Sequence, residues 1–572
     1  ELYDVRYLNP ISNGSLKKYK FQLKDTLYQA KDSVFVIAFE PFPNKNFQGL
    51  KGTLYVNSNR YAVQNVIASP AEKGKINISI QQQYVFLNNE YWFPEQLNYE
   101  LIFEGTEKDG DELVVEGKSY IDRVEFGLEV ERTDFPLRSI YMAENAGKKE
   151  LSFWKNYRPN SLDSVDLKTY HIVDSLGQKY HFDRYLNVLS GIFNYRIPIG
   201  FVDLDLSKTF IYNNYEGFRL GTGFYTNEKL FKKISFGGFF GYGLKDKEWK
   251  YGGEIIYKPT NRFSISGGYE NDLVETGKNN ENLENIFNPR RYIASRFDNT
   301  KHYFIELNFL PFRYVSTNIT FDRSKTIPKY NYEFLKNETV YTSYYNSTVN
   351  LGIRYAYGEK MVDVLGGITK WENQKYPVLS FSYTRGIKGF FESDFDYNKF
   401  EVGIEQTFHS RGLGISHYKL EGGLVDNPVP YGLLFTGKGS FDDDFPVIIK
   451  DHFQTMFLYE FLSNQKLNLF LSHDFGTLLF KTEKFQPKII LHQNIGWGNL
   501  SHPENHKFVN FKTMEEIYME SGLQFDNLLK INYLDIGYLG FGVAGFYRYG
   551  FYSLPEFEDN FSLKATIGFT IK

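Results

Sequence analysis

Cysteine is absent from the 572 residues of this chain. Without thiols the protein forms no disulfide, no thiolate metal site and no cysteine nucleophile, which fits export through an oxidising compartment. No apolar run reaches the length of about 18 residues that a transmembrane helix needs. An excess of one charge is lacking too, since 65 basic residues face 69 acidic ones and the formal net charge is -4. That balance argues against a nucleic-acid partner.

Aromatic residues are abundant instead, at 18% of the chain, with 54 Phe and 45 Tyr. Transmembrane β-barrels need such residues for the band that faces lipid and for the girdles at both interfaces. The mean hydropathy is nevertheless -0.42. The two values agree in a barrel, because half of every spanning strand faces a polar lumen.

The C-terminal residues Phe561 to Lys572 alternate strictly between apolar and polar side chains. A barrel strand shows lipid on one face and water on the other, so its apolar residues recur with period two. The chain end therefore resembles the last strand of an outer-membrane β-barrel. We therefore expect the protein in the bacterial outer membrane, in contact with outer-membrane lipids and lipopolysaccharide.

The chain divides into three parts. Residues 1–150 predict a periplasmic antiparallel sheet domain, 151–185 a helical connector at the barrel rim, and 186–572 the barrel. The order of the N-terminal strands is similar to the half-barrel of periplasmic lipoprotein carriers. A packed spacer domain beneath the barrel is the alternative. The N-terminal strands are expected at Tyr19–Tyr28, Ser33–Glu40, Gly52–Asn57, Ala62–Ala68, Ile76–Leu87, Tyr91–Phe103 and Leu113–Val124.

The connector is expected to be a helix from Ser161 to Tyr185, with Ser161 as its N-cap before an acidic first turn. Its apolar residues recur at mostly helical spacing, which predicts packing against the periplasmic rim. The apolar positions are Leu162, Val165, Tyr170, Val173 and Leu176.

Beyond the connector, alternating segments predict an antiparallel transmembrane barrel of about 16 to 18 strands, by the spacing usual for bacterial barrels. They include Val188–Pro198, Val202–Ile211, Gly217–Asn227, Ile234–Leu244, Trp249–Pro259, Phe263–Leu273, Tyr376–Ile387, Lys399–His409, His452–Ser463, Lys466–Thr477 and Ile536–Tyr549.

The side on which the long connections lie depends on this strand count. Counting back from a periplasmic C-terminus places Glu275–Thr300, Lys325–Thr342 and Asn427–Asp451 on the periplasmic side. A miscount by one strand makes them ordinary surface loops.

The connector and the barrel resemble a known family, the Bacteroidota-type outer-membrane barrels known only as a domain of unknown function. That family usually follows a carboxypeptidase-regulatory-like domain, which these residues do not contain, and it implies a location but no catalytic residue. The matching stretches are Phe153–Pro159, Tyr215–Leu220, Lys375–Leu379, Val429–Leu434, Tyr459–Phe461, Gly476–Phe480, Ile531–Leu534 and Phe546–Gly550.

A more distant resemblance joins Gly217–Gly223 and Glu520–Asn527 to the barrels that insert or secrete proteins. Those barrels brace the lumen with an Arg-Gly pair at the tip of an inward-folded loop. The candidates here are Arg411-Gly412, which reads as a tight turn, and Arg385-Gly386. The resemblance therefore implies an accessory role beside an assembly machine rather than direct insertion.

Catalytic residue types occur as sequence neighbours, but neighbours on a strand point to opposite faces and cannot form a dyad. We therefore expect no enzyme, no catalytic site, no metal and no cofactor. The Asp442–Asp444 run lacks the spacing of a calcium loop and reads as a solvated turn. Glycine pairs inside strand patterns mark bends rather than phosphate cradles. The residues considered are His409, Ser410, Ser416, His417, His473 and Asp474, with Gly237-Gly238 and Gly252-Gly253.

These observations favour an accessory component of outer-membrane protein or surface-lipoprotein assembly and export. The expected partners are the assembly machinery and surface lipoproteins. The alternative is a transport pore with a periplasmic regulatory domain, and a structural protein or an enzyme at the barrel mouth comes third. No secretory leader precedes Glu1, so we expect this residue to lie well inside the precursor. The pairing of the first and last barrel strands, near Val188 and Phe561, is left open, although a weakly paired closure would expose a strand edge.

Overall fold

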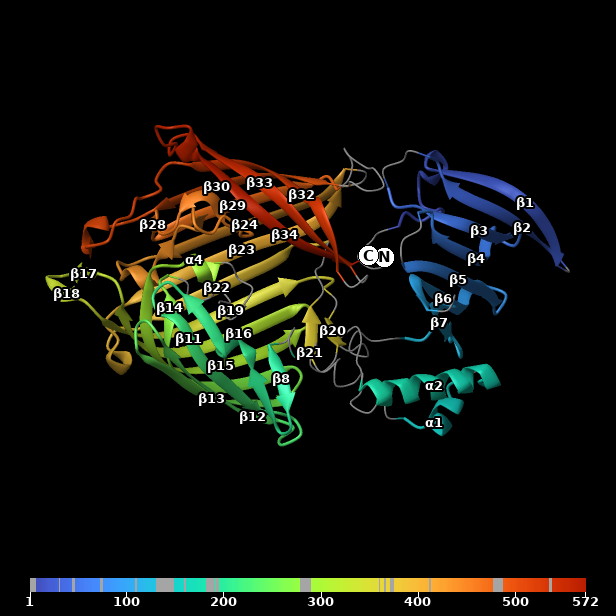
Figure 1. The fold of residues 1–572 in the computed structure, drawn as a ribbon, viewed down its shortest axis with the longest axis horizontal. Helices are drawn as coiled ribbons and strands as arrows, with labels where there is room; N and C mark the ends of the chain where they lie inside the picture. Colours follow the sequence, from blue (N-terminus) through green and yellow to red (C-terminus); the bar gives the residue numbers. More distant parts are fainter. Residues whose placement is uncertain are drawn as a thin grey trace.

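The structure is a computed structural model in which the chain is all-β, with two large antiparallel sheets (Figure 1). Among the residues that it describes, no helix is long and apolar enough to cross a membrane. Described are residues 7–29, 31–43, 47–72, 76–108, 111–129, 149–158, 161–181, 191, 195–277, 290–359, 361–364, 367–370, 375–410, 413–476, 487–533 and 537–571.

The N-terminal sheet has seven strands in the order of the chain, β1 to β7, and each pairs with the next in antiparallel fashion. The predicted sheet and the places of its strands are confirmed. Its core is formed by Tyr19, Phe39, Leu54 and Ala68, all at most 5% exposed. The strands are β1 Tyr19–Gln29, β2 Asp32–Pro41, β3 Leu50–Asn57, β4 Ala62–Pro70, β5 Ile76–Leu87, β6 Tyr91–Lys108 and β7 Asp111–Tyr120.

The connector contains two helices, α1 (Leu151–Lys155) and α2 (Ser164–Tyr180). The prediction of Ser161 as N-cap was wrong, because Asp163 caps α2. The Asp163 carboxylate accepts the Val165 and Asp166 backbone N–H groups, each at 2.8 Å. The carboxylate of Asp166 completes a capping box with the Asp163 N–H. Among the described residues of α2, none is buried. The prediction that the apolar residues of this helix pack against the barrel rim is therefore wrong.

The second sheet contains eighteen strand segments and curls into a barrel (Figure 1). This confirms the predicted barrel and its range of strand number. Long strands run from β11 to β34, and every neighbouring pair among them is antiparallel. They are β11 Gly217–Thr226, β12 Ile234–Gly243, β13 Trp249–Thr260, β14 Phe263–Glu275, β15 Phe297–Phe312, β16 Val315–Pro328, β19 Tyr344–Ala356, β22 Val378–Gly386, β23 Tyr397–Ser410, β24 Gly414–Val425, β29 Gln465–Asp474, β30 Lys488–Asn499, β32 Tyr518–Tyr533, β33 Gly537–Tyr549 and β34 Phe561–Ile571.

The beginning of the barrel is built from short strands. Strands β9 (Val202–Asp205) and β10 (Phe210–Asn213) both pair with β11, so they occupy one position interrupted by the 3-10 helix η4 (Leu206–Lys208). The sequence predicted one unbroken strand here. Strand β8 (Arg196–Ile199) pairs with β9. Following the antiparallel pairs from β8 round to β34 shows that these two neighbours in the sheet run in the same direction.

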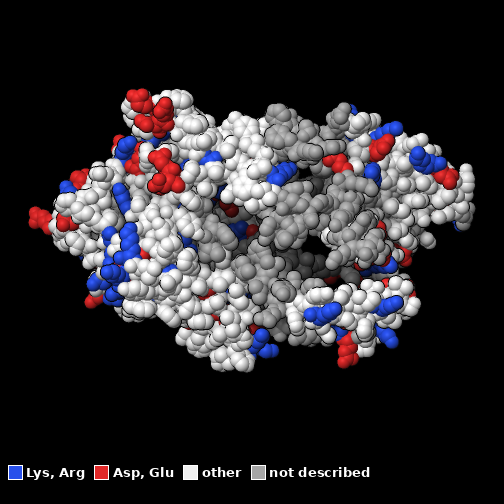
Figure 2. Space-filling model, in the orientation of Figure 1, with Lys and Arg blue, Asp and Glu red and all other residues white. Residues whose placement is uncertain are grey.

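The two faces of the wall differ sharply, as β34 illustrates. Leu563 and Ile567 are 61% and 64% exposed, whereas Lys564 and Thr566 between them are buried toward the lumen. On the described surface, few charged atoms appear on the middle of the barrel, and they gather at the end on the left of Figure 2. An apolar band around the wall with charges at its end is the surface that a lipid bilayer requires.

The barrel has two distinct ends. We call the end where β34 finishes the near end, and the seven-stranded sheet lies beyond it (Figure 1). The opposite end is the far end. Alternation of strand direction places the described residues 276–277 and 290–296 at the far end, together with 329–343 and the two ends of 426–464. The expectation that the long connections share a side with the C-terminus was therefore wrong.

One segment explains this error. His452–Ser463 was predicted as a wall strand, but it contains only β27 (Phe453–Phe457) and β28 (Leu462–Ser463), which pair outside the wall. One extra strand in the count reverses the side of every earlier connection. The remaining short elements are α4 Arg290–Ile293, β17 Glu333–Lys336, β18 Thr339–Tyr341, β20 Met361–Val364, β21 Gly367–Lys370, β25 Phe435–Thr436, β26 Gly439–Phe441 and β31 His506–Lys507.

The N-terminal core gives a first prediction. Phe39→Ala removes a ring that is 2% exposed, and we expect it to destabilise the sheet by about 3–5 kcal/mol. Limited proteolysis of the full chain would then cut within residues 7–120 sooner, while the barrel keeps its folded, heat-modifiable mobility on gels. Leu27→Ala is the matched control, because Leu27 is 41% exposed. Equal protease resistance of the two variants would contradict the assignment of this core.

Candidate functional site

Residues 426–464 fold back into the barrel between β24 and β29, and we call this segment the plug. Both of its ends leave the wall at the far end. Its middle reaches close to the near end, because Asp451 lies 3.3 Å from His417, only three residues after β24 begins at Gly414. Phe453 and Met456 of the plug are fully buried. The plug thus crosses most of the length of the lumen.

Glu520, on β32, anchors the plug. Its carboxylate is fully buried and accepts the backbone N–H groups of Gln454 at 2.7 Å and Thr455 at 2.9 Å. The Thr455 hydroxyl and the Asn494 amide donate to the same carboxylate at 2.6 and 2.7 Å. Charge-assisted bonds of this kind are short and strong, and here they fix the backbone of the plug against the wall.

Two arginines fasten the far half of the plug. Arg548 on β33 donates to both oxygens of Glu460 at 3.0 and 3.1 Å. Arg290 on α4 binds Glu275 on β14 at 2.7 Å and donates to the Gly439 carbonyl at 2.6 Å. Because these charges are buried, each depends on its partner for the solvation that it has lost.

Other residues of the plug meet charges of both signs on β24. Lys438 donates to Glu421 on β24 at 2.9 Å, and Asp451 lies 3.5 Å from Lys419. A cavity of about 1030 Å³ separates the plug from one side of the wall. Its lining includes Asn318, Asn350, Glu401, Glu421, Lys450 and Lys466.

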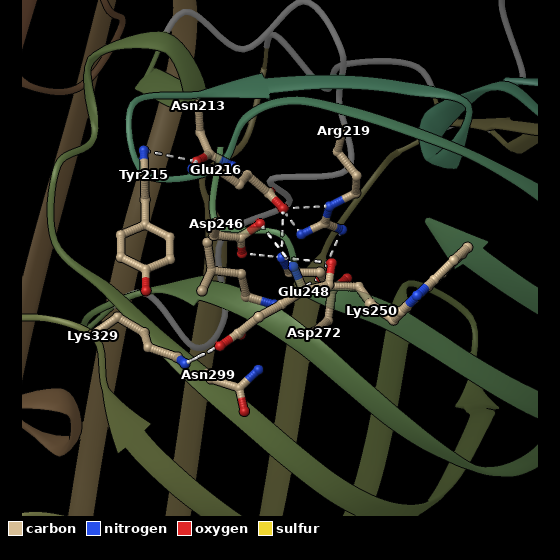
Figure 3. Close-up of polar contacts among 12 residues, drawn as sticks. Asn213, Tyr215, Glu216, Arg219, Asp246, Glu248, Lys250, Asp272, Asn299 and Lys329 are labelled. Atoms are coloured by element: carbon tan, nitrogen blue, oxygen red, sulfur yellow. Dashed lines mark hydrogen bonds and ion pairs between the residues drawn. The ribbon is translucent and has the colours of Figure 1, made fainter. Parts of the chain in front are cut away.

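A second charge network lies on the wall between β10 and β14 (Figure 3). The fully buried Glu216 binds Arg219 at 2.7 Å and Lys250 at 3.2 Å, and Arg219 also binds Asp272 at 2.7 Å. Lys250 pairs with Asp246 as well. These side chains converge on one another in Figure 3, and together they brace four consecutive strands, β11 to β14, at their far ends.

Aromatic side chains cover the plug at the far end. Tyr332 accepts the Tyr431 N–H at 2.8 Å, and its hydroxyl lies 2.9 Å from Nδ1 of His506. The His506 ring also contacts Phe334 and Phe511 at 5.2 and 5.8 Å between centroids. Burial in this cluster lowers the pKa of His506 to about 4. The imidazole is therefore neutral at pH 7, and its Nδ1 can accept the Tyr332 O–H.

The structure separates the catalytic residue types that adjoin in the sequence and pairs them across strands instead. Ser416 lies 2.8 Å from Nδ1 of His473, whose Nε2 faces the Leu413 carbonyl at 3.2 Å. His417 faces Asp451 of the plug. These contacts join β24 to β29 and to the plug, a cross-strand arrangement that neighbours in sequence do not reveal.

The other predicted positions resolve as follows. Asp442 accepts the Asp444 and Phe445 N–H groups at 3.0 and 2.9 Å, which confirms a turn. Arg385 lies on β22 and binds Asp396 at 2.7 Å, and the Asp396 carbonyl accepts the Asn427 amide at the start of the plug. Arg411-Gly412 lies outside the described residues. The glycine pairs Gly237-Gly238 and Gly252-Gly253 are confirmed within paired strands. Within the described residues, no three His, Asp or Glu side chains are grouped to hold a metal ion.

Sequence reasoning missed the charged residues that fix the plug, namely Glu275, Arg290, Glu460, Glu520 and Arg548. A signal was present for two of them. Glu520 and Arg548 occupy lumen-facing positions in long alternating strands, where an isolated charge needs a partner from inside the barrel.

Comparison with solved structures gives similar barrels at low identity. BamA from Haemophilus ducreyi lacking POTRA domains 1–3 is 10% identical with a TM-score of 0.39, covering 65% of this chain and 70% of that one. CdiB from Acinetobacter baumannii is 11% identical with a TM-score of 0.34, covering 61% and 56%. OprD from Pseudomonas aeruginosa is 8% identical with a TM-score of 0.30, covering 97% and 94%.

Two family models match the sequence. The "Family of unknown function (DUF5686) C-terminal domain" matches residues 202–513, and the "Family of unknown function (DUF5686)" matches residues 1–120. No curated protein matches the chain.

The wall network predicts a large loss of stability from a small change. Glu216→Gln removes the carboxylate that Arg219 and Lys250 share and leaves them only Asp272 and Asp246, and we expect a cost of about 1.5–3 kcal/mol from the lost charge-assisted hydrogen bonds. Thermal unfolding in detergent would show it as a lowered Tm. The control Glu40→Gln breaks an exposed pair with Lys20 and should change stability by less than about 1 kcal/mol. A Tm equal to that of the control would contradict a structural role for the network.

The cap around His506 predicts a dependence on pH. The pKa of His506 lies below its ordinary value of 6.5, so the unfolded residue binds a proton more readily than the folded one. The stabilisation is complete above about pH 6.5 and is lost as the pH falls toward 4. We expect a loss on the order of 2 kcal/mol at pH 5, seen as faster hydrogen exchange in residues 329–343 and 500–511.

Two variants test this assignment. His506→Gln should abolish most of the difference in exchange between pH 7.5 and pH 5, whereas His502→Gln, at a histidine with a 58% exposed side chain, should leave it unchanged. The assignment fails if both variants keep the full pH difference.

Proposed function

We propose that this chain, which belongs to the DUF5686 family of unknown function, is an integral outer-membrane β-barrel protein that serves as an accessory component in the assembly or export of outer-membrane proteins and surface lipoproteins. The observation that carries this proposal is the plug, which crosses the lumen of a barrel whose outer face is apolar. The seven-stranded sheet lies beyond one end of this barrel (Figure 1).

The wall supports the membrane location. Apolar side chains cover its outer face, and polar side chains face the lumen, as a bilayer demands of a spanning sheet. With the C-terminus in the periplasm, the near end and the seven-stranded sheet face the periplasm, and the long connections lie outside the cell. We also propose that the protein comes from a member of the Bacteroidota, as its resemblance to the outer-membrane barrels of that group implies.

The plug weakens the case for a simple pore. A permanently open channel needs a continuous water path, whereas here Glu520, Arg548 and Arg290 hold the plug across the lumen through buried ionic contacts. A transport pore is the second candidate, and the cavity of about 1030 Å³ between plug and wall is the observation in its favour. In that reading the plug moves and the periplasmic sheet regulates it.

The N-terminal sheet supports a role in handling clients. Leu23, Tyr28, Tyr99 and Val114 are between 42% and 85% exposed on it, and apolar side chains that are open to solvent offer contacts to an apolar ligand. Such a surface suits an apolar segment or an acyl chain of a lipoprotein. The partners that we propose are therefore the outer-membrane assembly machinery and surface lipoproteins, besides outer-membrane lipids and lipopolysaccharide.

We propose no enzymatic activity and no cofactor. The pair Ser416 and His473 has the distance of a catalytic dyad, but the structure pairs His473 Nε2 with a backbone carbonyl rather than with a carboxylate that would orient the ring. The pair joins two wall strands, β24 and β29, and its role in this proposal is structural.

Affinity purification of the tagged, membrane-extracted protein tests the proposal. We expect a protein-inserting barrel or surface lipoproteins to co-purify in mild detergent, and the variant Leu23→Lys with Tyr99→Lys to lose lipoproteins selectively. The matched control Tyr61→Lys changes a side chain that is 77% exposed at a turn and should retain them. Recovery of the chain alone, together with stepwise conductance in planar bilayers, would refute the assembly role and favour the pore.

A further inference from the structure

The seam of the barrel, where β34 meets the strands that begin the sheet, is held in an unusual way. At Ala565 of β34, the backbone N–H donates to the Pro446 carbonyl at 2.6 Å and the carbonyl accepts the Ile448 N–H at 3.3 Å. Val447 and Ala565 form a parallel bridge. At this residue the outer edge of β34 is thus paired with the plug, whereas elsewhere along the same edge β34 is the neighbour of β8 in the sheet.

We call residues Phe445–Ile449 the seam segment. Its other side reaches the first strands of the barrel through aromatic contacts. The Phe445 ring lies 5.8 Å from that of Tyr292 on α4, and Tyr292 stacks on Tyr212 of β10 at 6.5 Å between centroids. The seam segment and α4 together therefore bridge β34 to β10.

Neighbouring contacts strengthen the bridge on the lumen side. Lys564 is 1% exposed and donates to the Ser440 carbonyl at 2.9 Å. Arg290 ties α4 to the plug through the Gly439 carbonyl. The network around Glu216 and Arg219 stiffens the wall next to β10.

We propose that the stretch of the outer edge of β34 around Ala565, where the plug and not β8 is the backbone partner, is a docking edge for an extended strand of a second protein, and that the seam segment occupies this stretch until such a strand replaces it. This rests on the proposed role in assembly and names the kind of partner. Strand addition supplies the backbone hydrogen bonds that Ala565 now makes to Pro446 and Ile448, so the edge never faces lipid without partners.

The chemistry of the seam specifies the partner strand. Side chains of β34 alternate between lipid, at Leu563 and Ile567, and the lumen, at Lys564 and Thr566. A strand added beside β34 must follow the same alternation. Displacement of the plug removes the carbonyl that Lys564 binds, so an acidic or other acceptor side chain facing the lumen at that level would replace it.

The lack of cysteine makes a direct test available. In Val447→Cys with Ala565→Cys, the residues are bridged neighbours across adjacent strands, within the Cα spacing that a disulfide spans. Oxidation locks the seam segment onto β34, and reduction releases it. The probe is a fluorescein-labelled peptide with the sequence of Phe561–Lys572 and glutamate in place of Lys564, measured by anisotropy on the full-length protein in nanodiscs.

The matched control shares one of the two positions. Val543 on β33 is the other neighbour of Ala565, and because Ala565 directs its backbone groups toward the plug, these two residues form a non-hydrogen-bonded pair. Val543→Cys with Ala565→Cys locks β34 to its permanent partner and leaves the seam segment free. A shuffled peptide of the same composition controls for binding to lipid.

We expect oxidation of the 447–565 pair to weaken binding of the strand peptide at least tenfold, and oxidation of the 543–565 pair to leave it unchanged. Tyr292→Ala, which removes the link to β10, should strengthen binding. Equal binding by the oxidised and reduced 447–565 forms overturns the proposal, as does binding by none of the forms, including Tyr292→Ala. If the disulfide does not change peptide binding but the assembly proteins or lipoproteins still co-purify, the docking edge alone is refuted. If the disulfide weakens peptide binding but nothing co-purifies, the assembly role alone is refuted.

Discussion

A sheet that lies in lipid has to pair every backbone N–H and C=O group, since no water is there to receive them. Most of this barrel meets the requirement with long antiparallel ladders. At Ala565 the ladder partner is Pro446 and Ile448 of the plug. The plug is therefore a part of the wall at that point, and the arrangement of the lumen, the seam and α4 follows from this one backbone pairing.

Charges inside the barrel serve the same requirement. Glu520 accepts two backbone N–H groups that the plug would otherwise leave unpaired, and Arg290 serves a plug carbonyl in the same manner. Each charge is neutralised or solvated by the segment that it holds. The whole plug is therefore held in one conformation, because its release would deprive several buried charges of their partners at the same time.

The sequence predicts the wall well because period-two alternation is a local property, and the seven N-terminal strands and the C-terminal strand show this directly. The prediction from sequence fails where a segment with the same alternation pairs with residues inside the lumen instead of with a neighbouring wall strand. His452–Ser463 alternates enough to resemble a wall strand, yet Glu520 and Asn494 draw it into the lumen. Ser161 failed as an N-cap for a simpler reason, because Asp163 lies closer to the first helical turn and forms a capping box. The residues of the candidate site come from strands far apart in the chain, so local patterns could mark their charge but not their partners.

The pairing of Val447 with Ala565 also constrains the order of folding. The two residues are 118 positions apart (565 minus 447), and Ala565 lies in β34, which follows every other described wall strand in the chain. Contacts over such a separation form late, after the cost in loop entropy has been met by nearer pairings. The plug has to be threaded while the sheet is still an open, curved surface, since a closed wall would bar its entry. Closure of the cylinder thus follows placement of the plug, and a chain without β34 would remain an unclosed sheet around its own plug.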